Sequence, residues 1–307
     1  MNSAAASKRT TGSRSAVHSW LGWAPLILLP PLVLVFAPVS WPRWVVMWCL
    51  SVVIFAGCKW LTWWGAPATR APVWLHVAYF LAWPGLDAVH FLDCHRRPIR
   101  KPGSLEWFFA VSKLMLGLLL IFGVARLVPD SLPYLTGWSG MIGIVLFLHF
   151  GLFHLLSCIW RSVGIDAQPL MNWPLAAVSL SEFWSRRWNT AFRDLTHRFL
   201  FVPLTNWCGA TGAVLVGFLF SGLVHDAVIS LPAGGGYGGP TLFFGLQGVG
   251  LLIERTKAGR WFGLGKGWRG LLFTMLCLLI PAPLLFHPPF VTQVVVPFLQ
   301  SLGAVRC

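Results

Sequence analysis

Two polar clusters in the second half of the chain carry the residues that could do chemistry. Residues 183–189 read Phe-Trp-Ser-Arg-Arg-Trp-Asn, and residues 221–226 read Ser-Gly-Leu-Val-His-Asp. A histidine with an ordinary pKa of about 6.5 can accept a proton near neutral pH, which suits His225 to general-base catalysis. The carboxamide of Asn189 could hold a carbonyl group or orient a hydroxyl group. The sequence lacks a Gly-x-Ser-x-Gly elbow, so the clusters favour a reaction that needs a base and no covalent serine.

Each of these residues also has a purely structural interpretation. His225 could equally be a helix histidine hydrogen-bonded to a neighbouring helix, and Asn189 could face lipid headgroups at the membrane interface. The fork geometry of arginine suits the phosphates of a cofactor such as coenzyme A, but cations on an amphipathic helix also anchor it to anionic lipid. Both interpretations stay open for four residues: Arg186, Arg187, Arg193 and Arg198.

The elements that must position these residues are membrane helices. The chain has 307 residues, of which 56% are hydrophobic and 10% are charged, whereas about a quarter of the residues of soluble proteins are charged. Its 19 tryptophans suit membrane interfaces. The formal net charge of +14 lies mostly in short segments between apolar runs, where it sets topology and meets anionic lipid or an anionic substrate. We therefore predict an all-α, polytopic membrane protein with no nucleic-acid partner.

The apolar runs predict about eight transmembrane or re-entrant helices in a single domain, residues 20–307, which follows a disordered basic tail at residues 1–19. A Pro-Gly break makes residues 73–92 a candidate re-entrant or interfacial element. The basic connection at residues 94–101 is expected in the cytoplasm, like the N-terminus. The other expected spans are residues 20–39, 44–60, 107–127, 139–160, 204–229, 241–253 and 270–286, while residues 290–302 are too short to assign.

The clusters are expected on two successive helices. Ser179 and Glu182 have the spacing of a capping box, which predicts an amphipathic helix that begins there and is limited by Pro203. A straight second helix from residue 204 would carry His225 about 32 Å from its start. Asn189 and His225 can therefore meet only if the first helix dips inward, or if the second is tilted or begins outside the hydrocarbon core.

The second of these helices carries small residues at every fourth position. This pattern lets membrane helices approach closely, and it places His225 near a packed side rather than on a lipid face. The residues in question are Gly209, Ala213, Gly217 and Ser221.

The remaining polar residues predict no metal site. His149 and His154 diverge by about 140° on a helix, so joint ligation is disfavoured and ordinary packing is favoured. The glycine-rich residues 233–239 lack the Lys and Ser/Thr of a phosphate-binding loop and predict a flexible turn. The cysteines show no paired metal-ligand spacing and fit apolar core positions. They are Cys49, Cys58, Cys94, Cys158, Cys208, Cys277 and Cys307.

Taken together, the two clusters resemble the membrane-bound O-acyltransferase superfamily, and its wax-synthase-like branch fits best. The resemblance is carried by residues 183–189 with the following Phe-Arg pair at 192–193, and by residues 221–226. Residues 79–87 and 169–171 also look like segments of bacterial members, so the resemblance covers roughly residues 75–255. Asp226 stands where many relatives carry Glu.

The resemblance implies that Asn189 and His225 are the family's polar pair in a tunnel within the membrane. Acyl-CoA would then be a co-substrate, with no permanently bound cofactor, and a lipophilic alcohol would arrive through the bilayer. His225 would act as the general base that allows a fatty acyl group to pass from acyl-CoA to the alcohol. The implied setting is a bacterial inner membrane, and the implied product is a wax ester or related neutral lipid. The implied substrate-binding residues are Trp184, Arg186, Arg187, Trp188, Arg193 and Ser221.

Two other functions remain open at the level of sequence. One is acyl transfer to a cell-surface glycan or another polymer. The other is a non-enzymatic membrane protein that binds or transports lipid, although transporters often show two related halves and no internal repeat is evident by eye.

Overall fold

The computed structural model describes residues 20–67, 70–93 and 99–306. Within these ranges every regular element is a helix, which confirms the predicted all-α class. The predicted basic tail at residues 1–19, part of the basic connection at 94–98, and Cys307 lie outside the described residues.

The first half of the chain forms these elements, where η marks a π- or 3₁₀-helical turn: α2 (Trp20–Phe36), α3 (Arg43–Trp64), α4 (Val73–Leu81), α5 (Ala88–Leu92), α6 (Ser104–Leu119), η1 (Leu120–Val124), α7 (Ala125–Leu127), α8 (Pro133–Val145), η2 (Leu146–Leu152), α9 (Phe153–Ser162) and η3 (Pro174–Ala176). The second half forms α10 (Leu180–Glu182), η4 (Phe183–Arg187), α11 (Thr190–Thr196), η5 (His197–Phe201), α12 (Val202–His225), η6 (Asp226–Ser230), α13 (Leu231–Ala233), α14 (Gly239–Arg255), α15 (Lys257–Trp261), α16 (Gly267–Leu279), α17 (Ala282–Leu285), α18 (Pro288–Phe290), η7 (Val291–Val295) and α19 (Val296–Ser301).

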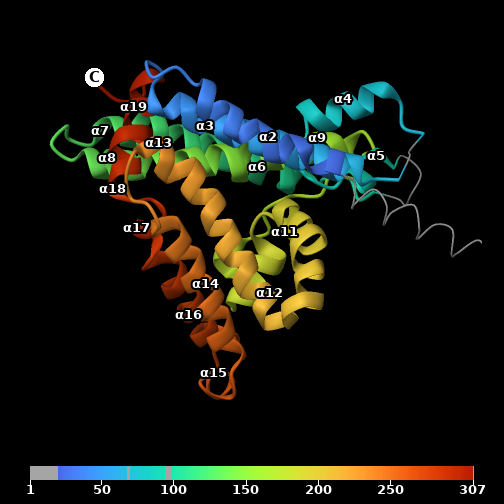
Figure 1. Ribbon diagram of the computed structural model, residues 1–307. Helices are drawn as coiled ribbons and strands as arrows, with labels where there is room; N and C mark the ends of the chain where they lie inside the picture. Colours follow the sequence, from blue (N-terminus) through green and yellow to red (C-terminus); the bar gives the residue numbers. More distant parts are fainter. Residues whose placement is uncertain (1–19, 68–69, 94–98, 307) are drawn as a thin grey trace, which may run out of the picture.

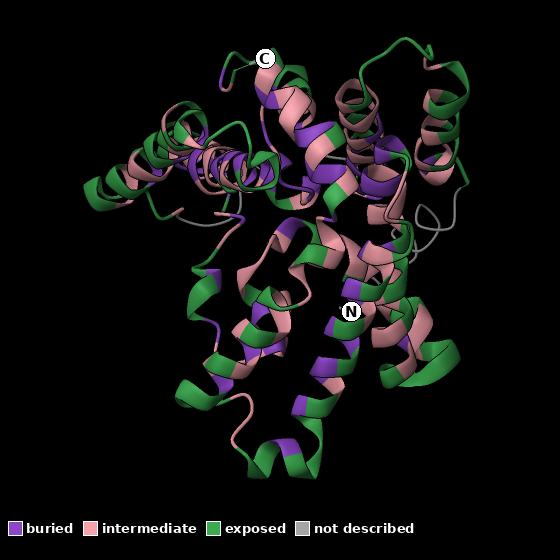
Figure 2. Ribbon diagram, turned by 90° about the vertical axis from the view of Figure 1, so that its left-hand side faces the viewer, coloured by how far each residue is buried: buried purple, intermediate pink, exposed green. Residues whose placement is uncertain are grey.

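The helices form two groups in space (Figure 1). One group, with α2, α3, α6, α8 and α9, runs across the upper part of the view, and the other, with α11, α12, α14 and α16, extends below it. Exposed residues alternate with buried ones along the extended helices (Figure 2), as expected for helices that offer one side to lipid. The protein is therefore built as a layer with a protruding helical arm.

Five helical runs are long and apolar enough to cross a membrane, which supports an integral membrane protein. The runs are Arg43–Trp64, Ser104–Leu127, Pro133–Ser162, Thr190–Ala233 and Gly267–Leu285. Two of the predicted spans correspond to shorter helices of 17 residues each, α2 and α14. The predicted total of about eight spanning or re-entrant helices is thus not confirmed.

The Pro-Gly break near residue 84 separates two short helices, α4 and α5, neither of which is long enough to span a membrane. The non-helical backbone between them is satisfied by side chains from other helices. Nζ of Lys59 in α3 donates to the carbonyls of Tyr79 and Gly85, at 2.7 and 2.5 Å. The indole of Trp160 donates to the carbonyl of Ala82 at 3.0 Å. A buried lysine that is 1% exposed thus supports the irregular segment, as membrane-buried backbone requires.

The predicted amphipathic helix begins where expected but does not continue as a single helix. The Ser179 side chain accepts from the backbone N–H of Glu182 at 2.9 Å, so α10 begins at Leu180. The helix is interrupted at Asn189, whose φ of 40° lies in the left-handed region that Asn tolerates better than most residues. The prediction that Pro203 limits it was wrong, because the π turn of η5 just before this proline accommodates the missing N–H and the helical run continues.

The predicted span at residues 204–229 contains a fold-back near its start, and this is the largest correction to the predicted fold. Cys208 leaves the helical region, and Gly209 adopts φ 70° and ψ 172°, a conformation open essentially to glycine alone. A Cβ placed on Gly217 would lie 3.9 Å from Cδ2 of Leu200. In a straight helix these residues would be about 25 Å apart, so the two arms of this hairpin lie side by side.

The small-residue pattern in α12 contributes less than predicted to close helix packing. Among the glycines of α12, Gly222 approaches α14 most closely, since an added Cβ would come 2.5 Å from the Cα of Thr241. Gly209 lies in the hairpin turn itself, with nothing within 4 Å of an added Cβ. The glycine that packs against α14 is thus Gly222, which follows Ser221 and does not belong to the pattern.

Candidate active site

The imidazole of His225 is held in one orientation at the end of α12. Its Nδ1 lies 2.7 Å from the carbonyl oxygen of Ser221 one turn earlier. A carbonyl can only accept a hydrogen bond, so Nδ1 carries the proton and Nε2 bears the free lone pair. Nε2 makes no hydrogen bond to any residue that the structure describes. His225 therefore has the tautomer of a general base.

An aromatic wall lies between His225 and the first polar cluster. The ring of Phe244 in α14 lies 4.5 Å from the His225 ring, centre to centre, and 5.7 Å from the indole of Trp184. The indole also contacts Phe218 at 5.6 Å. Its Nε1 is buried and has no hydrogen-bond partner among the described residues. Trp184 thus offers an unused donor on a wall that it shares with the imidazole.

Asn189 lies at the start of α11 with its side chain free. Its backbone N–H points at the sulfur of Met171, at 3.2 Å, and Thr190 donates to the carbonyl of Leu170 at 3.0 Å. The carboxamide caps no helix and makes no hydrogen bond within the described part of the chain. Next to it, Trp188 stacks on Phe183 with ring centres 5.6 Å apart.

The hairpin places Asn189 and His225 at similar positions along its two arms, but their side chains are not in contact. If the pairing of Leu200 with Gly217 is continued residue by residue, His225 lies level with Phe192, about one helical turn from Asn189. No hydrogen bond or ring contact links the two side chains in the described ranges. The predicted tunnel between them remains a prediction.

Most of the candidate arginines are engaged in holding the local structure. Arg187 pairs with Glu182, Nη2 to Oε1 at 2.7 Å, and also donates to the carbonyls of Asn172 and Trp173. Arg193 pairs with Asp194 and donates to the carbonyl of Ser185 at 2.8 Å. The guanidinium of Arg198 donates to the carbonyl of Gly65 at 2.8 Å, at the end of α3.

Arg186 is the exception, since it is exposed and forms no ion pair with the described residues. Among the three arginines predicted to bind substrate, only Arg186 therefore lacks an ion pair in the described part of the chain. Ser221 contributes its carbonyl to His225 rather than to a ligand.

Glu182 is held ionised by this arrangement. Burial raises the pKa of its carboxyl, but the N–H of Val178 and the guanidinium of Arg187 outweigh burial, and the pKa lies below its usual range. In a standard capping box, Glu182 would accept from the N–H of Ser179. Here its carboxylate accepts instead from the N–H of Val178, one residue earlier, at 2.9 Å.

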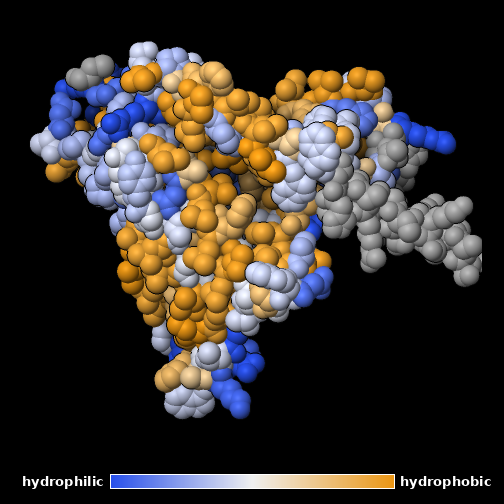
Figure 3. Space-filling view, viewed as in Figure 1, coloured by the Kyte–Doolittle hydropathy of each residue, from blue (hydrophilic) through white to orange (hydrophobic). Residues whose placement is uncertain are grey.

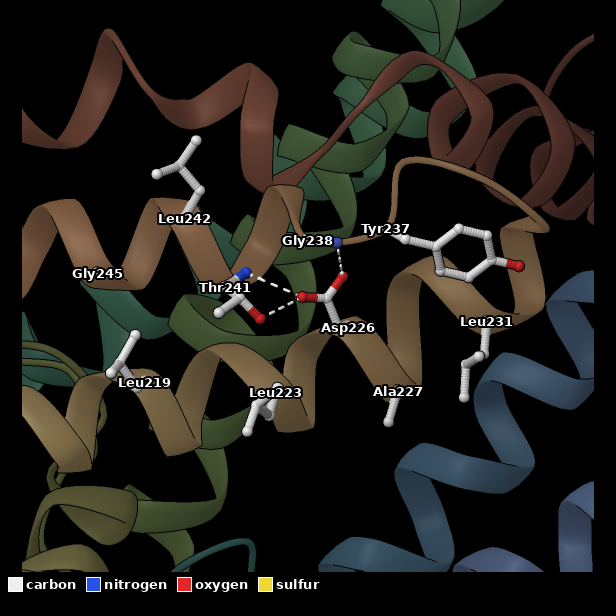
Figure 4. A pocket seen from close by; sticks show the side chains of 10 residues that line it. All are labelled: Leu219, Leu223, Asp226, Ala227, Leu231, Tyr237, Gly238, Thr241, Leu242 and Gly245. Carbon is white, nitrogen blue, oxygen red and sulfur yellow. Dashed lines mark hydrogen bonds between the residues drawn. The ribbon is translucent and has the colours of Figure 1, made fainter.

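Asp226, the residue after His225, ties the end of α12 to α14 (Figure 4). Its two carboxylate oxygens accept from the N–H groups of Gly238 and Thr241, at 2.9 and 3.0 Å, and from the hydroxyls of Ser230 and Thr241. Four donors therefore occupy this carboxylate, and it acts as a structural link.

A groove of about 660 Å³ opens beside Asp226. Leu219, Leu223 and Ala227 line it from one face of the α12 arm, while Thr241 and Leu242 line it from α14. His225 lies about 200° around the helix from Leu223, so its ring faces away from this groove. The groove is therefore separate from the predicted chamber.

The segment that contains both polar clusters is similar to a known protein family. Residues 167–246 match the membrane bound O-acyl transferase family. This segment contains Asn189, His225 and Phe244, and it ends inside α14.

Several plant proteins are also similar to this chain. A probable long-chain-alcohol O-fatty-acyltransferase 2 of Arabidopsis thaliana is 31% identical over 137 residues, 41% of this chain and 40% of that protein. The long-chain-alcohol O-fatty-acyltransferase of Simmondsia chinensis is 28% identical over 175 residues, 47% of each chain. A third relative, the probable long-chain-alcohol O-fatty-acyltransferase 9 of Arabidopsis thaliana, is 32% identical over 145 residues, 42% of each chain. The chain thus spans less than half the length of these relatives.

A further group of polar residues lies outside residues 167–246, between α6 and α9. Ligand-type atoms of Glu106, His154 and Cys158 lie within 4.8 Å of one another. Lys113 donates to Nδ1 of His154 at 2.9 Å, so Nε2 carries the proton and donates to Glu106 at 3.3 Å. Arg161 pairs with the same carboxylate. A metal ion would need the Nε2 lone pair that this proton occupies, so the set fits an ionic link between helices better than a metal site.

Three residues with clear roles were missed from the sequence. Lys59 carried a usable signal, because a lone lysine in an apolar run must find partners. His154 is expected to pack as an ordinary helix residue, whereas its ring contacts Lys113 and Glu106 on α6. Phe244 carried no signal, since one phenylalanine among many does not reveal which one faces a histidine.

Proposed function

We propose that the protein is a membrane-embedded O-acyltransferase that transfers a fatty acyl group from acyl-CoA to the hydroxyl of a long-chain alcohol. The observation that carries this proposal is the tautomer of His225, whose Nε2 is free to accept a proton within a segment that matches the acyltransferase family. The names of the plant relatives support a fatty alcohol as acceptor, which would make the product a wax ester or related neutral lipid.

The proposed reaction needs no covalent intermediate on the protein. Nε2 of His225 takes the proton of the acceptor hydroxyl while that oxygen bonds to the thioester carbonyl carbon. The carbon–sulfur bond then breaks, and the departing sulfur takes up the proton, giving the ester and free coenzyme A. The carbonyl oxygen gains negative charge on the way, and the carboxamide of Asn189 and the indole N–H of Trp184 are the uncommitted donors available to hold it.

We further propose that residues 20–307 act as one membrane domain in a bacterial inner membrane, with the N-terminus in the cytoplasm. The likeness of residues 79–87 to bacterial members and the basic connection at residues 94–101 support this setting.

The test is acyl transfer by the purified full-length protein with labelled acyl-CoA and a panel of alcohols. Replacing His225 by Gln keeps a polar side chain of similar size but removes the base, and we expect turnover to fall about 10²- to 10⁴-fold. Asn189→Ala should reduce turnover without unfolding the protein. His149→Gln, a second histidine change outside the proposed pair, should leave turnover near that of the wild type. Equal ester formation by all four proteins would remove His225 from the mechanism.

A further inference from the structure

The segment just before the first polar cluster, residues 178–182, and the end of α14 lie side by side, although they are about 75 residues apart in the sequence. Arg255 donates from Nη2 to the hydroxyl of Ser181 at 3.2 Å, and Glu254 accepts from the N–H of Leu180 at 2.7 Å. A Cβ on Gly270 would lie 2.2 Å from the carbonyl oxygen of Val178. The α15 region, residues 255–269, is therefore a direct neighbour of residues 178–182.

The spacing of the π turn brings a further cation to this contact. Arg187 reaches Glu182, five residues before it, at 2.7 Å. Arg186 lies on the same π turn, beside Arg187, and its charge acts on the carboxyl of Glu182. An exposed guanidinium of η4 thus lies close to the segment that Arg255 contacts.

These two arginines belong to a larger cationic surface, which we call the basic rim. Its members are exposed and make no salt bridge within the described residues, while the neighbouring acids Glu182 and Glu254 are occupied by Arg187 and by the N–H of Leu180. Hydrophilic atoms gather around α15 at the lower tip of Figure 3, below a hydrophobic band. The basic rim consists of Arg186, Arg255, Lys257, Arg260, Lys266 and Arg269.

Exposed aromatic rings lie among these cations. Trp261 and Trp268 are 79% and 69% exposed. The guanidinium of Arg269 lies over the Trp268 ring, 5.6 Å from its centre. Flat rings next to arginines can stack on a nucleotide base as well as lie in lipid headgroups.

We propose that the basic rim binds the phosphates of the coenzyme A part of the acyl donor, with Trp261 or Trp268 stacking on its adenine. This inference rests on the proposed function and assigns the α15 region to donor binding. The η4 turn favours this partner over a lipid headgroup, because Trp184 on that turn contacts the wall shared with His225 while Arg186 on the same turn is exposed. The phosphates of the acyl donor would then lie at the basic rim beside Arg186, and its thioester would reach His225 next to Trp184.

The experiment measures binding of coenzyme A and of 3′-dephospho-coenzyme A to the full-length protein in nanodiscs of uncharged lipid. The main variant is the double change Lys257→Ala with Arg260→Ala, since neither side chain makes a hydrogen bond or salt bridge in the described structure. Arg255→Ala is the second variant, and Arg126→Ala, an exposed cation at the end of α7, is the matched control. We expect Kd for coenzyme A to rise about tenfold or more in the two rim variants and to stay unchanged in the control.

Three outcomes separate the possible failures. If the wild type does not bind coenzyme A at all, the proposed donor is wrong and this inference falls with it. If the wild type binds and the rim variants bind equally well, the basic rim is not the donor site although the proposed function stands. Weaker binding of the rim variants to vesicles with anionic lipid, with unchanged binding of coenzyme A, would instead identify the rim as a lipid anchor and overturn the proposal.

Discussion

Replacing Gly209 by Ala should destabilise the protein through backbone conformation alone. Gly209 adopts φ 70° and ψ 172°, which an alanine reaches only at a cost of about 1–3 kcal/mol. No atom lies within 4 Å of the added methyl group, so steric overlap adds nothing to this cost. We expect a fall in the unfolding midpoint of about 2–10 °C, measured by tryptophan fluorescence in detergent.

Gly217→Ala is the matched control for this change. Gly217 lies in the helical part of the same run, and the nearest atom to an added methyl is 3.9 Å away. This variant should be as stable as the wild type, or more stable by up to about 1 kcal/mol, because alanine favours the helix. Equal midpoints for the two variants would show that Gly209 is not in the strained conformation.

The fold-back itself can be tested by cross-linking. Cysteines introduced at positions 200 and 217 should be joined by a short bifunctional maleimide, with the linked peptides identified by mass spectrometry. A straight helix would separate these positions by about 25 Å and prevent the link. Failure to cross-link under conditions that label both sites would refute the hairpin. The inference that Asn189 and His225 lie at similar positions along its two arms would then fall as well.

The remaining predictions concern two further polar contacts. Lys59→Met should lower stability by about 2–5 kcal/mol because it leaves the carbonyls of Tyr79 and Gly85 buried and unpaired, whereas Lys101→Met, at an exposed position, should be neutral in the same melting assay. The pKa of Glu182 lies below its ordinary value of about 4.3, so its ionised form stabilises the fold above that pH, and this contribution is lost as the pH falls through the lowered pKa. Glu182→Gln should therefore flatten the acid limb of the stability profile, and an unchanged limb would mean that other carboxyls set it.

The parts of the fold that follow from local patterns could be predicted from the sequence. The start of the helix at Leu180 follows from a serine and a glutamate at capping distance, and the non-spanning character of residues 73–92 follows from a Pro-Gly pair within an apolar run. In the candidate site, His225 and Asn189 could be chosen because polar residues are costly in membrane helices.

The rest depends on tertiary structure that residue types alone do not encode. Gly209 fits a helix-packing pattern as well as a turn, and only its φ and ψ distinguish the two. Pro203 predicts a helix end, because the π turn that accommodates it has no sequence signature here. Which arginines are free depends on acids and carbonyls that come from other segments, as Arg187 and Arg198 show.

The hairpin between residues 190 and 233 also changes how the orientation of the later helices must be counted. A hydropathy plot treats this apolar stretch as one crossing, which would reverse the inside and outside assignments of every later segment. Because the stretch doubles back at Gly209, its two ends emerge together, and reporter fusions placed just before residue 190 and just after residue 233 should mark the same compartment.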